Sequence, residues 1–158
     1  MMKIIKAVTT AQYHAGALLF REYADSLDFT LSFQRFDDEL NILNQMYAPP
    51  TGALLLVMDH EVYAGAVGLR QIENETTCEV KRMYIRPQYQ GKGVGKLLME
   101  SVIEEAKAMN YKIIKLDTLA KMIPAVSLYK SFGFKETKPY NYNPYADVLY
   151  FEKYLSWE

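Results

Sequence analysis

The chain has 158 residues, of which 50% are hydrophobic, and a formal net charge of −1. This length suits one domain with a buried core, so we expect a single domain over residues 1–158. The near-neutral charge argues against nucleic acid as the main partner. The sequence has no apolar run long enough to span a membrane, and its N-terminus lacks the apolar core of a signal peptide, so we expect a cytoplasmic protein with no membrane partner.

Hydrophobic periodicity and turn residues predict alternating strands and helices along the chain. Thr9 or Thr10 is a typical N-cap for the first helix, and the prolines at 49 and 50 end the second. In chain order we expect a strand at 3–8, a helix from about 9 to 27, an irregular segment at 28–35, a helix at 36–47, strands at 54–58, 64–70 and 77–85, a helix from the following glycine-rich turn to about 109, a strand at 113–118, a helix at 124–132, and strands at 134–139 and 148–154.

The most informative segment is VKRMYIRPQYQGKGVGKLL at residues 80–98, where a strand runs into a glycine-rich turn and then a helix. Gly91, Gly93 and Gly95 remove side chains where backbone must approach an anion, and the first amides of the following helix attract phosphate. The turn therefore predicts a cradle for a phosphorylated cofactor. Four basic side chains are expected to surround it: Lys92, Lys96, Arg82 and Arg86.

Other phosphate-binding loops fit this turn less well. A P-loop requires Lys followed by Ser or Thr, whereas Lys92 precedes glycine and Lys96 precedes leucine. A dinucleotide-binding turn requires G-x-G-x-x-G with an acid about 20 residues later, but the spacing here is G-x-G-x-G and Asp117 comes late. A glycine turn that only caps the next helix is a further alternative.

The pattern Gln90-x-x-Gly93-x-Gly95 resembles the pyrophosphate-binding loop of the GNAT superfamily of acyl-CoA-dependent N-acyltransferases. Residues 125–134, A-x-x-L-Y-x-x-x-G-F, resemble a second signature of that family. The resemblance implies an α/β (mixed α+β) domain with a mixed, mostly antiparallel, twisted sheet of about seven strands flanked by about four helices. It also implies that acetyl-CoA is the cosubstrate.

By the same resemblance, the end of the 77–85 strand and the glycine-rich turn bind the cofactor, with the amides of Met83 and Ile85 on the acyl carbonyl and the pantetheine. The chain departs from many relatives at Met122, where they have an asparagine that hydrogen-bonds the cofactor. The full set of implied cofactor-binding residues is Met83, Tyr84, Ile85, Gln90, Gly91, Lys92, Gly93, Val94, Gly95 and Lys96.

Acyl transfer to an amine requires a base that gives the neutral amine and a donor for the departing thiolate. Glu79 lies where some relatives that acetylate lysine place a catalytic glutamate, so it is the candidate base; the alternative is an ion pair with Lys81 or Arg82. Tyr129 matches the family tyrosine that can protonate the thiolate, and the alternative is a core residue.

The resemblance places the acceptor site at residues 27–36 and 140–147. Aromatic rings and nearby carboxylates there suit a cationic small amine or a peptide amino group. Alternatively, the rings fill the core and the acids favour a helix N-terminus. The residues concerned are Phe29, Phe33, Phe36, Tyr140, Tyr142 and Tyr145, with Asp37, Asp38, Glu39 and Asp147.

The sequence therefore predicts an acetyl-CoA-dependent N-acetyltransferase that works by direct transfer in a ternary complex. Neither Cys78, which we expect to be a small buried residue, nor any serine has a recognisable activating histidine. His14 and His60 match no metal-ligand spacing, so no metal is expected. The alternative from another class is a non-catalytic acyl-CoA-binding sensor or regulatory module, which would not need Glu79 and Tyr129. A possible homodimer would use the last strand as its edge, through Tyr150, Phe151, Tyr154 and Trp157.

Overall fold

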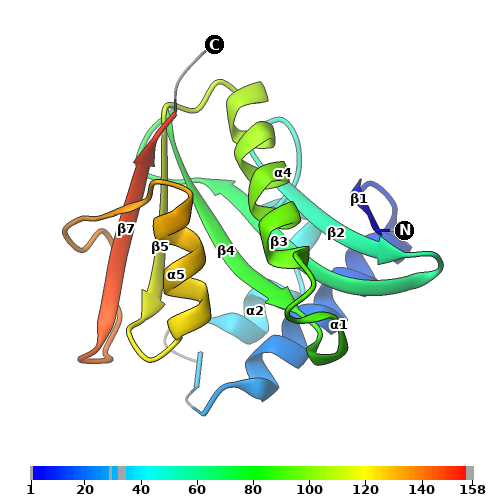
Figure 1. The fold of residues 1–158 in the computed structure, drawn as a ribbon. Helices are drawn as coiled ribbons and strands as arrows, with labels where there is room; N and C mark the ends of the chain where they lie inside the picture. Colours follow the sequence, from blue (N-terminus) through cyan, green and yellow to red (C-terminus); the bar gives the residue numbers. More distant parts are fainter. Residues whose placement is uncertain (1, 29, 32–34, 156–158) are drawn as a thin grey trace.

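The computed structural model describes residues 2–28, 30–31 and 35–155. Within them, seven strands form one sheet in the order β1-β2-β3-β4-β5-β7-β6, and five helices pack against it (Figure 1). The strands are β1 Met2–Lys6, β2 Ala53–Asp59, β3 Val62–Gln71, β4 Thr77–Ile85, β5 Ile113–Leu119, β6 Lys135–Glu136 and β7 Val148–Tyr154, and the helices are α1 Thr10–Ser26, α2 Phe36–Leu40, α3 Leu43–Met46, α4 Val94–Ala108 and α5 Ile123–Ser131.

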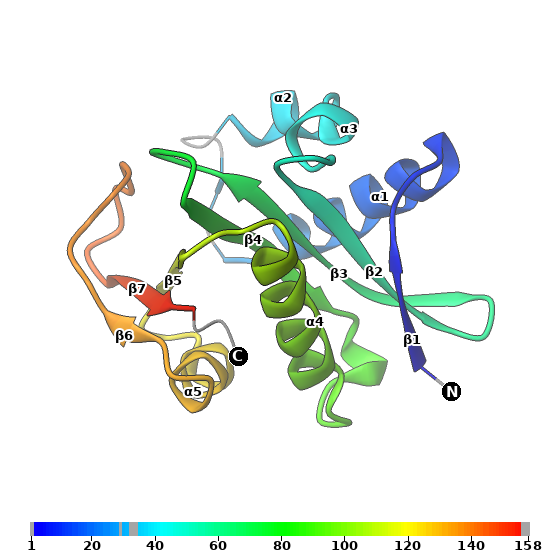
Figure 2. The same ribbon diagram turned by 90° about the horizontal axis from the view of Figure 1, so that it is seen from above.

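The sheet separates two helical layers. Helices α1, α2 and α3 cover one face, and α4 and α5 cover the other (Figure 2). Because side chains alternate along a strand, β2 sends Leu54 and Leu56 into the core under α1, and Leu55 and Val57 into the core under α4. Both faces of the central strands are therefore buried, and polar side chains on β4 lie on a covered surface.

Strands β4 and β5 are the parallel pair, and they separate after a short contact. Their register contains Thr77 opposite Ile113, Cys78 opposite Ile114 and Glu79 opposite Lys115, and it ends there. Further along β4 the register with β3 shifts by one residue, and Arg82 takes a left-handed backbone conformation with φ of 60°. Such a bulge bends the strand. Among the described residues, the edge of β4 that faces β5 therefore has no strand partner beyond Glu79.

Most expected elements are confirmed, including the capping box that Thr9 forms with Gln12 at the start of α1. Three expectations about elements are wrong. The helix expected at 36–47 is two short helices, because the amides of Asn41 and Ile42 bond back only three residues. The strand expected at 134–139 stops at Glu136, shortly before Pro139, which has no amide to donate.

The third concerns the last strand, β7. It lies inside the described sheet, between β5 and β6, and not at its edge. Tyr150 and Phe151 are buried in the protein's own core, Tyr154 is exposed, and Trp157 lies outside the described residues.

Cys78 is buried as expected, and burial raises the pKa of its thiol. No helix within the described part of the chain has the length and apolar character needed to cross a membrane.

Candidate active site

A cavity of about 740 Å³ opens where β4 leaves β5. The end of β4, the glycine-rich turn and the first turn of α4 form one side of it, and α5 forms the other, with Tyr23 and Ser26 of α1 at its end. Nine of the ten expected cofactor-binding residues line this cavity: Met83, Tyr84, Ile85, Gln90, Gly91, Gly93, Val94, Gly95 and Lys96. Lys92 does not, and its ammonium group lies over the ring of Tyr89, 6.0 Å from the centroid.

The glycine-rich turn has the backbone that an anion cradle needs. Gly91 and Gly93 have φ of 76° and 80°, and a Cβ atom on either would meet nothing within 4 Å. Gly93 is the N-cap of α4 and provides no side-chain cap, so the first amides of the helix remain available to a ligand. Gln90 stabilises the turn by donating from Nε2 to the carbonyl of Ile85 at 3.0 Å. The residues present therefore fit a pyrophosphate.

Arg82 and Arg86 do not contribute positive charge to this cradle, contrary to the expectation from sequence. Both guanidinium groups are paired with glutamates of the α1–α2 layer. Arg86 binds Glu22 of α1 at 2.6 Å, and Arg82 binds Glu39 of α2 at 3.1 Å. Arg82 instead attaches that helical layer to β4, and Arg86 attaches it to the chain directly after β4. Lys96 is a basic residue that lines the cavity.

We expect the substitution Gly93→Ala to weaken CoA binding by at least about tenfold, since 1.4 kcal/mol corresponds to a factor of ten. The new Cβ would occupy the space that the phosphate needs, and a non-glycine residue in this conformation costs about 1–2 kcal/mol. Calorimetric titration with CoA measures the change. Lys92→Ala is the matched control within the same turn, and equal losses in both variants would contradict the placement of Lys92 outside the cavity.

Tyr129 of α5 lines the cofactor cavity and also packs in the core. Its ring lies 6.1 Å from that of Phe134 and 6.4 Å from that of Phe151. Its hydroxyl makes no hydrogen bond with the described residues. Burial raises the pKa of Tyr129, so the hydroxyl stays protonated at neutral pH. The structure is compatible with both roles considered for Tyr129, because its ring packs in the core and its hydroxyl is available as a donor. Met122 lines the cavity beside it.

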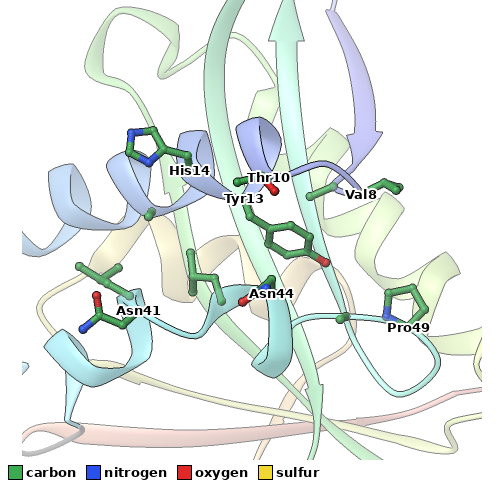
Figure 3. Close-up of a pocket in the computed structure, with 12 residues that line it drawn as sticks. Val8, Thr10, Tyr13, His14, Asn41, Asn44 and Pro49 are labelled. Carbon is green, nitrogen blue, oxygen red and sulfur yellow. The ribbon is translucent and has the colours of Figure 1, made fainter.

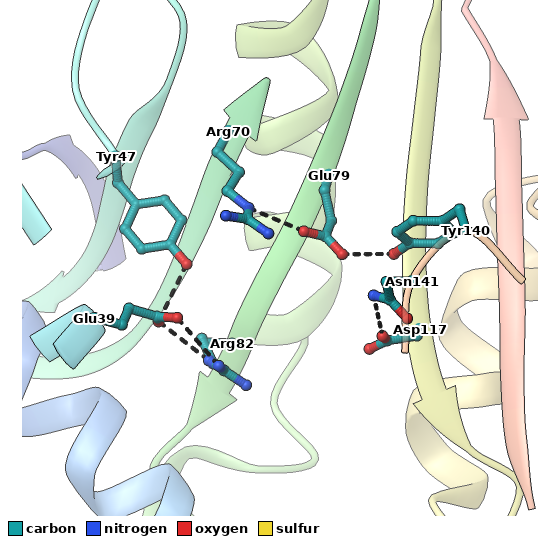
Figure 4. A network of polar contacts seen from close by, with 8 residues as sticks. All are labelled: Glu39, Tyr47, Arg70, Glu79, Arg82, Asp117, Tyr140 and Asn141. Atoms are coloured by element: carbon teal, nitrogen blue, oxygen red, sulfur yellow. Dashed lines mark hydrogen bonds and ion pairs between the residues drawn. The ribbon is translucent and has the colours of Figure 1, made fainter. Parts of the chain in front are cut away.

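Glu79 is fully buried on the α2 side of β4 and does not line the cofactor cavity. Its partners differ from the Lys81 or Arg82 considered in the sequence (Figure 4). Arg70, opposite it on β3, donates from Nε to Oε1 at 3.0 Å, and the hydroxyl of Tyr140 donates to Oε2 at 2.6 Å. Burial and then the charge of Glu79 raise the pKa of Tyr140. Glu79 is thus held by two donors from distant parts of the chain.

A second cavity, of about 690 Å³, lies on this same side of β4. Lys81 of β4, Arg70 of β3, residues 35–46 around α2, and the segment after β6 enclose it. Of the two regions in which the acceptor site was expected, 27–36 contributes Arg35 to the lining and 140–147 contributes Asn141 and Tyr142. Of the aromatic residues expected there, Tyr142 lines the cavity, Phe36 packs under Arg82 with its ring centroid 5.1 Å from the guanidinium carbon, and Phe29 and Phe33 lie outside the described residues.

A third cavity, of about 530 Å³, lies between α1 and the α2–α3 segment (Figure 3). His14 and Tyr13 border it from α1, and Asn41 and Asn44 border it from the opposite side. No residue of β4 or β5 lines it. It is therefore separate from the glycine-rich turn and from Glu79, and we do not assign the acceptor to it.

Sequence reasoning missed four residues that surround the second cavity and Glu79. These are Arg70, Lys81 as a cavity residue, Asn141 and Asp117. Asn141 donates from Nδ2 to Asp117 on β5 at 2.8 Å. The available signal was the polar residues at alternate positions 77, 79 and 81 of a central strand, because buried polar groups require partners.

Comparisons with known proteins agree with this geometry. The family model described as "Acetyltransferase (GNAT) family" matches residues 18–134. An uncharacterized N-acetyltransferase of Schizosaccharomyces pombe is 39% identical over 140 residues, which cover 88% of this chain and 86% of that protein. Human N-acetylaspartate synthetase is 36% identical over 95 residues, which cover 59% of this chain and 31% of that protein.

Solved structures share the fold. An acetyltransferase from Streptococcus agalactiae superimposes with a TM-score of 0.80 at 22% identity, over 98% of both chains. A protein from Salmonella typhimurium, described as an acetyltransferase and solved with its cofactor acetyl-CoA, gives a TM-score of 0.72 at 19% identity, over 98% of this chain and 94% of that one.

Proposed function

Because the chain belongs to the GNAT family of acetyltransferases, we propose that it transfers the acetyl group of acetyl-CoA to a primary amine by direct transfer in a ternary complex. One observation carries the proposal. The cavity at the separation of β4 and β5 is lined by the glycine-rich turn on one side and by Tyr129 on the other. A second cavity for the amine lies across β4.

Acetyl-CoA supplies an activated acetyl group as a thioester, and we propose that the amides of the glycine-rich turn bind its pyrophosphate. The amide of Met83, which lies within the bulge and beyond the last residue of β4 that pairs with β5, is proposed to bind the acetyl oxygen. An amide at this position stabilises the negative charge that develops on that oxygen when the amine attacks. Met122 provides an apolar wall in place of a hydrogen bond.

We propose that Glu79 accepts the proton that the ammonium group of the acceptor must lose. An amine with a pKa near 10 is almost fully protonated at neutral pH, so a base increases the reactive fraction. Glu79 is buried and its Oε2 already accepts from Tyr140. In the proposed route the Tyr140 hydroxyl therefore passes its proton to Glu79 while it takes one from the acceptor side. The free amine nitrogen then bonds to the acetyl carbon.

When the carbon–sulfur bond breaks, its electron pair remains on sulfur, and we propose that Tyr129 donates a hydrogen bond to this thiolate. Tyr129→Phe is expected to lower kcat by about 10²-fold, with little change in CoA affinity or stability because the ring is retained. Tyr13→Phe is a matched control, since its hydroxyl bonds to the carbonyl of Tyr47 beside the third cavity. Near-normal turnover in Tyr129→Phe would leave this residue a core role only.

The experiment that tests the function measures release of CoA thiol from acetyl-CoA with and without a panel of amines, alongside calorimetric titration of CoA. The panel contains polyamines, aminoglycosides, lysine peptides, peptide N-termini and amino acids. Aspartate is included because one relative is named N-acetylaspartate synthetase. Amine-dependent release supports the proposal. Tight CoA binding without release for any amine would contradict it.

A further inference from the structure

The second cavity, which we call the acceptor pocket, is lined by ten residues: Arg35, Asp38, Glu39, Asn41, Ile42, Met46, Arg70, Lys81, Asn141 and Tyr142. Three of them are cations, and they come from the start of α2, from β3 and from β4. An amine that is only cationic would have to bind beside this positive charge. The acids at the pocket therefore decide whether such an amine is favoured.

Four acids lie around the acceptor pocket, and each is already bound to a described side chain; Figure 4 shows the contacts of Glu39, Glu79 and Asp117. Glu39 accepts two hydrogen bonds from Arg82 and one from Tyr47. Asp38 pairs with Arg35 at 2.8 Å, Glu79 accepts from Arg70 and Tyr140, and Asp117 accepts from Asn141. The carboxylates that could attract a cationic acceptor are thus already hydrogen-bonded to side chains of the protein itself.

Arg70 and Lys81 present cationic groups to the acceptor pocket. Arg70 uses Nε for Glu79, and its two terminal nitrogens donate no hydrogen bond to the described residues. Lys81 is 7% exposed. Burial lowers its pKa; the charge of Arg82 adds to this lowering, and the charges of Glu79, Asp117 and Glu39 oppose it. A planar guanidinium and a nearby ammonium group are well suited to bind a carboxylate.

Asn141 adds a hydrogen-bond acceptor at the same pocket. Its Nδ2 donates to Asp117, while its Oδ1 is buried and has no donor among the described residues. A buried acceptor without a donor is costly. The nitrogen of an acceptor amine could supply that donor. The polar lining therefore offers partners for both charged ends of a zwitterion.

We propose that the acceptor is an amine that also carries a carboxylate, as an α-amino acid does, with the carboxylate bound by Arg70 and Lys81. This proposal rests on the proposed acetyl transfer and adds the class of the acceptor. Lys81 then has a second effect, because a positive charge near the incoming ammonium group lowers the pKa of that group and favours the neutral amine.

The test compares three forms of one acceptor in the thiol-release assay: an amino acid, its α-amide and the decarboxylated amine. Aspartate, alanine and phenylalanine each provide such a set. For at least one set, kcat/KM for the amino acid is expected to exceed that for both other forms by about 10²-fold, as for the loss of a buried charge partner. Faster turnover of the amides or simple amines in every set would overturn this proposal and leave the acetyl transfer in place.

Variants at position 81 separate recognition from folding. Lys81→Met is expected to reduce the ratio of amino-acid to amide turnover by at least about tenfold, and Lys81→Arg is expected to restore most of it. Arg21→Gln is the matched control, because Arg21 is a partly exposed cation of α1 that pairs with Asp37 and lines none of the three cavities. A purely structural role for Lys81 would lower both rates equally and leave the ratio unchanged, which would contradict the proposal.

If no amine is turned over, direct binding distinguishes the two proposals. The CoA-bound protein is titrated calorimetrically with an N-acetyl amino acid and with its amide. Tighter binding of the carboxylate form by about tenfold or more, lost in Lys81→Met, supports the acceptor class even though the acetyl transfer would have failed. Equal binding of the two forms overturns the acceptor class.

Discussion

Replacing Glu79 by Gln is expected to lower kcat by about 10²–10³-fold, within the usual contribution of a general base. The amide cannot accept a proton, and it also places a neutral group against Arg70. The KM for acetyl-CoA is expected to stay within about twofold, a factor worth less than 0.5 kcal/mol, because Glu79 does not line the cofactor cavity. The deficit is expected to shrink as the pH rises toward the amine's own pKa of about 10. A pH–rate profile measures both effects.

The control for this prediction is Tyr140→Phe. It leaves the charge of Glu79 and its bond to Arg70 intact but removes the hydroxyl that donates to Oε2. If the proton passes through Tyr140, this variant loses activity to a similar degree and has the same altered pH profile. Normal activity in Tyr140→Phe with loss in Glu79→Gln would show that Glu79 acts without the hydroxyl. A rate reduction in Glu79→Gln that is the same at every pH would contradict the role as a base.

Replacing Glu39 by Ala is expected to lower the free energy of unfolding by about 3–5 kcal/mol, as for other buried ion pairs that lose one partner. The side chains of Glu39 and Arg82 are each 4% exposed. Burial alone lowers the pKa of Arg82, but the Glu39 carboxylate raises it above the usual value for arginine. In the Glu39→Ala variant the guanidinium would therefore remain charged and would lack its partner. Urea unfolding measures the change.

Asp38→Ala is the control on the same helix. Asp38 also pairs with an arginine, but both partners are largely exposed, so the expected loss is about 1 kcal/mol or less. In a third protein Glu39 and Arg82 are both replaced by Leu, which removes the unpaired charge and is expected to recover much of the stability. If Glu39→Ala and Asp38→Ala were equally stable, the buried pair would contribute no more than the exposed one.

The side of the cofactor cavity formed by residues 83–96 could be predicted from sequence because its parts are contiguous. The sequence of the turn from Gln90 to Gly95 favours its conformation, since glycine adopts the positive φ of Gly91 and Gly93 at lower cost than other residues. The strand before it and the helix after it have clear periodicities. The sequence did not indicate that Lys92 lies outside the lining of the cavity, because the direction of a side chain in a turn depends on local torsions that a motif does not specify.

The acceptor pocket could be predicted only as two regions of the chain, since its chemistry depends on register and on loop packing. Arg70 meets Glu79 because β3 and β4 pair in one register, and the bulge at Arg82 changes that register further along. From an irregular segment after β6, Asn141 reaches the pocket and Tyr140 reaches Glu79. No periodicity governs such a segment, so the pairing of its side chains with β4 and β5 followed only from the structure.

The short pairing between β4 and β5 affects the stability of the sheet. Three residue pairs join a four-stranded unit, β1 to β4, to a three-stranded unit, β5 to β7. The cofactor cavity has the glycine-rich turn of the first unit on one side and α5 of the second on the other. A ligand in this cavity would contact both units and so add to the three residue pairs that join them in the sheet. At a free concentration a hundredfold above its dissociation constant, the ligand would raise the free energy of unfolding by about 2.7 kcal/mol. The concentration of CoA would therefore also affect how stable the protein is.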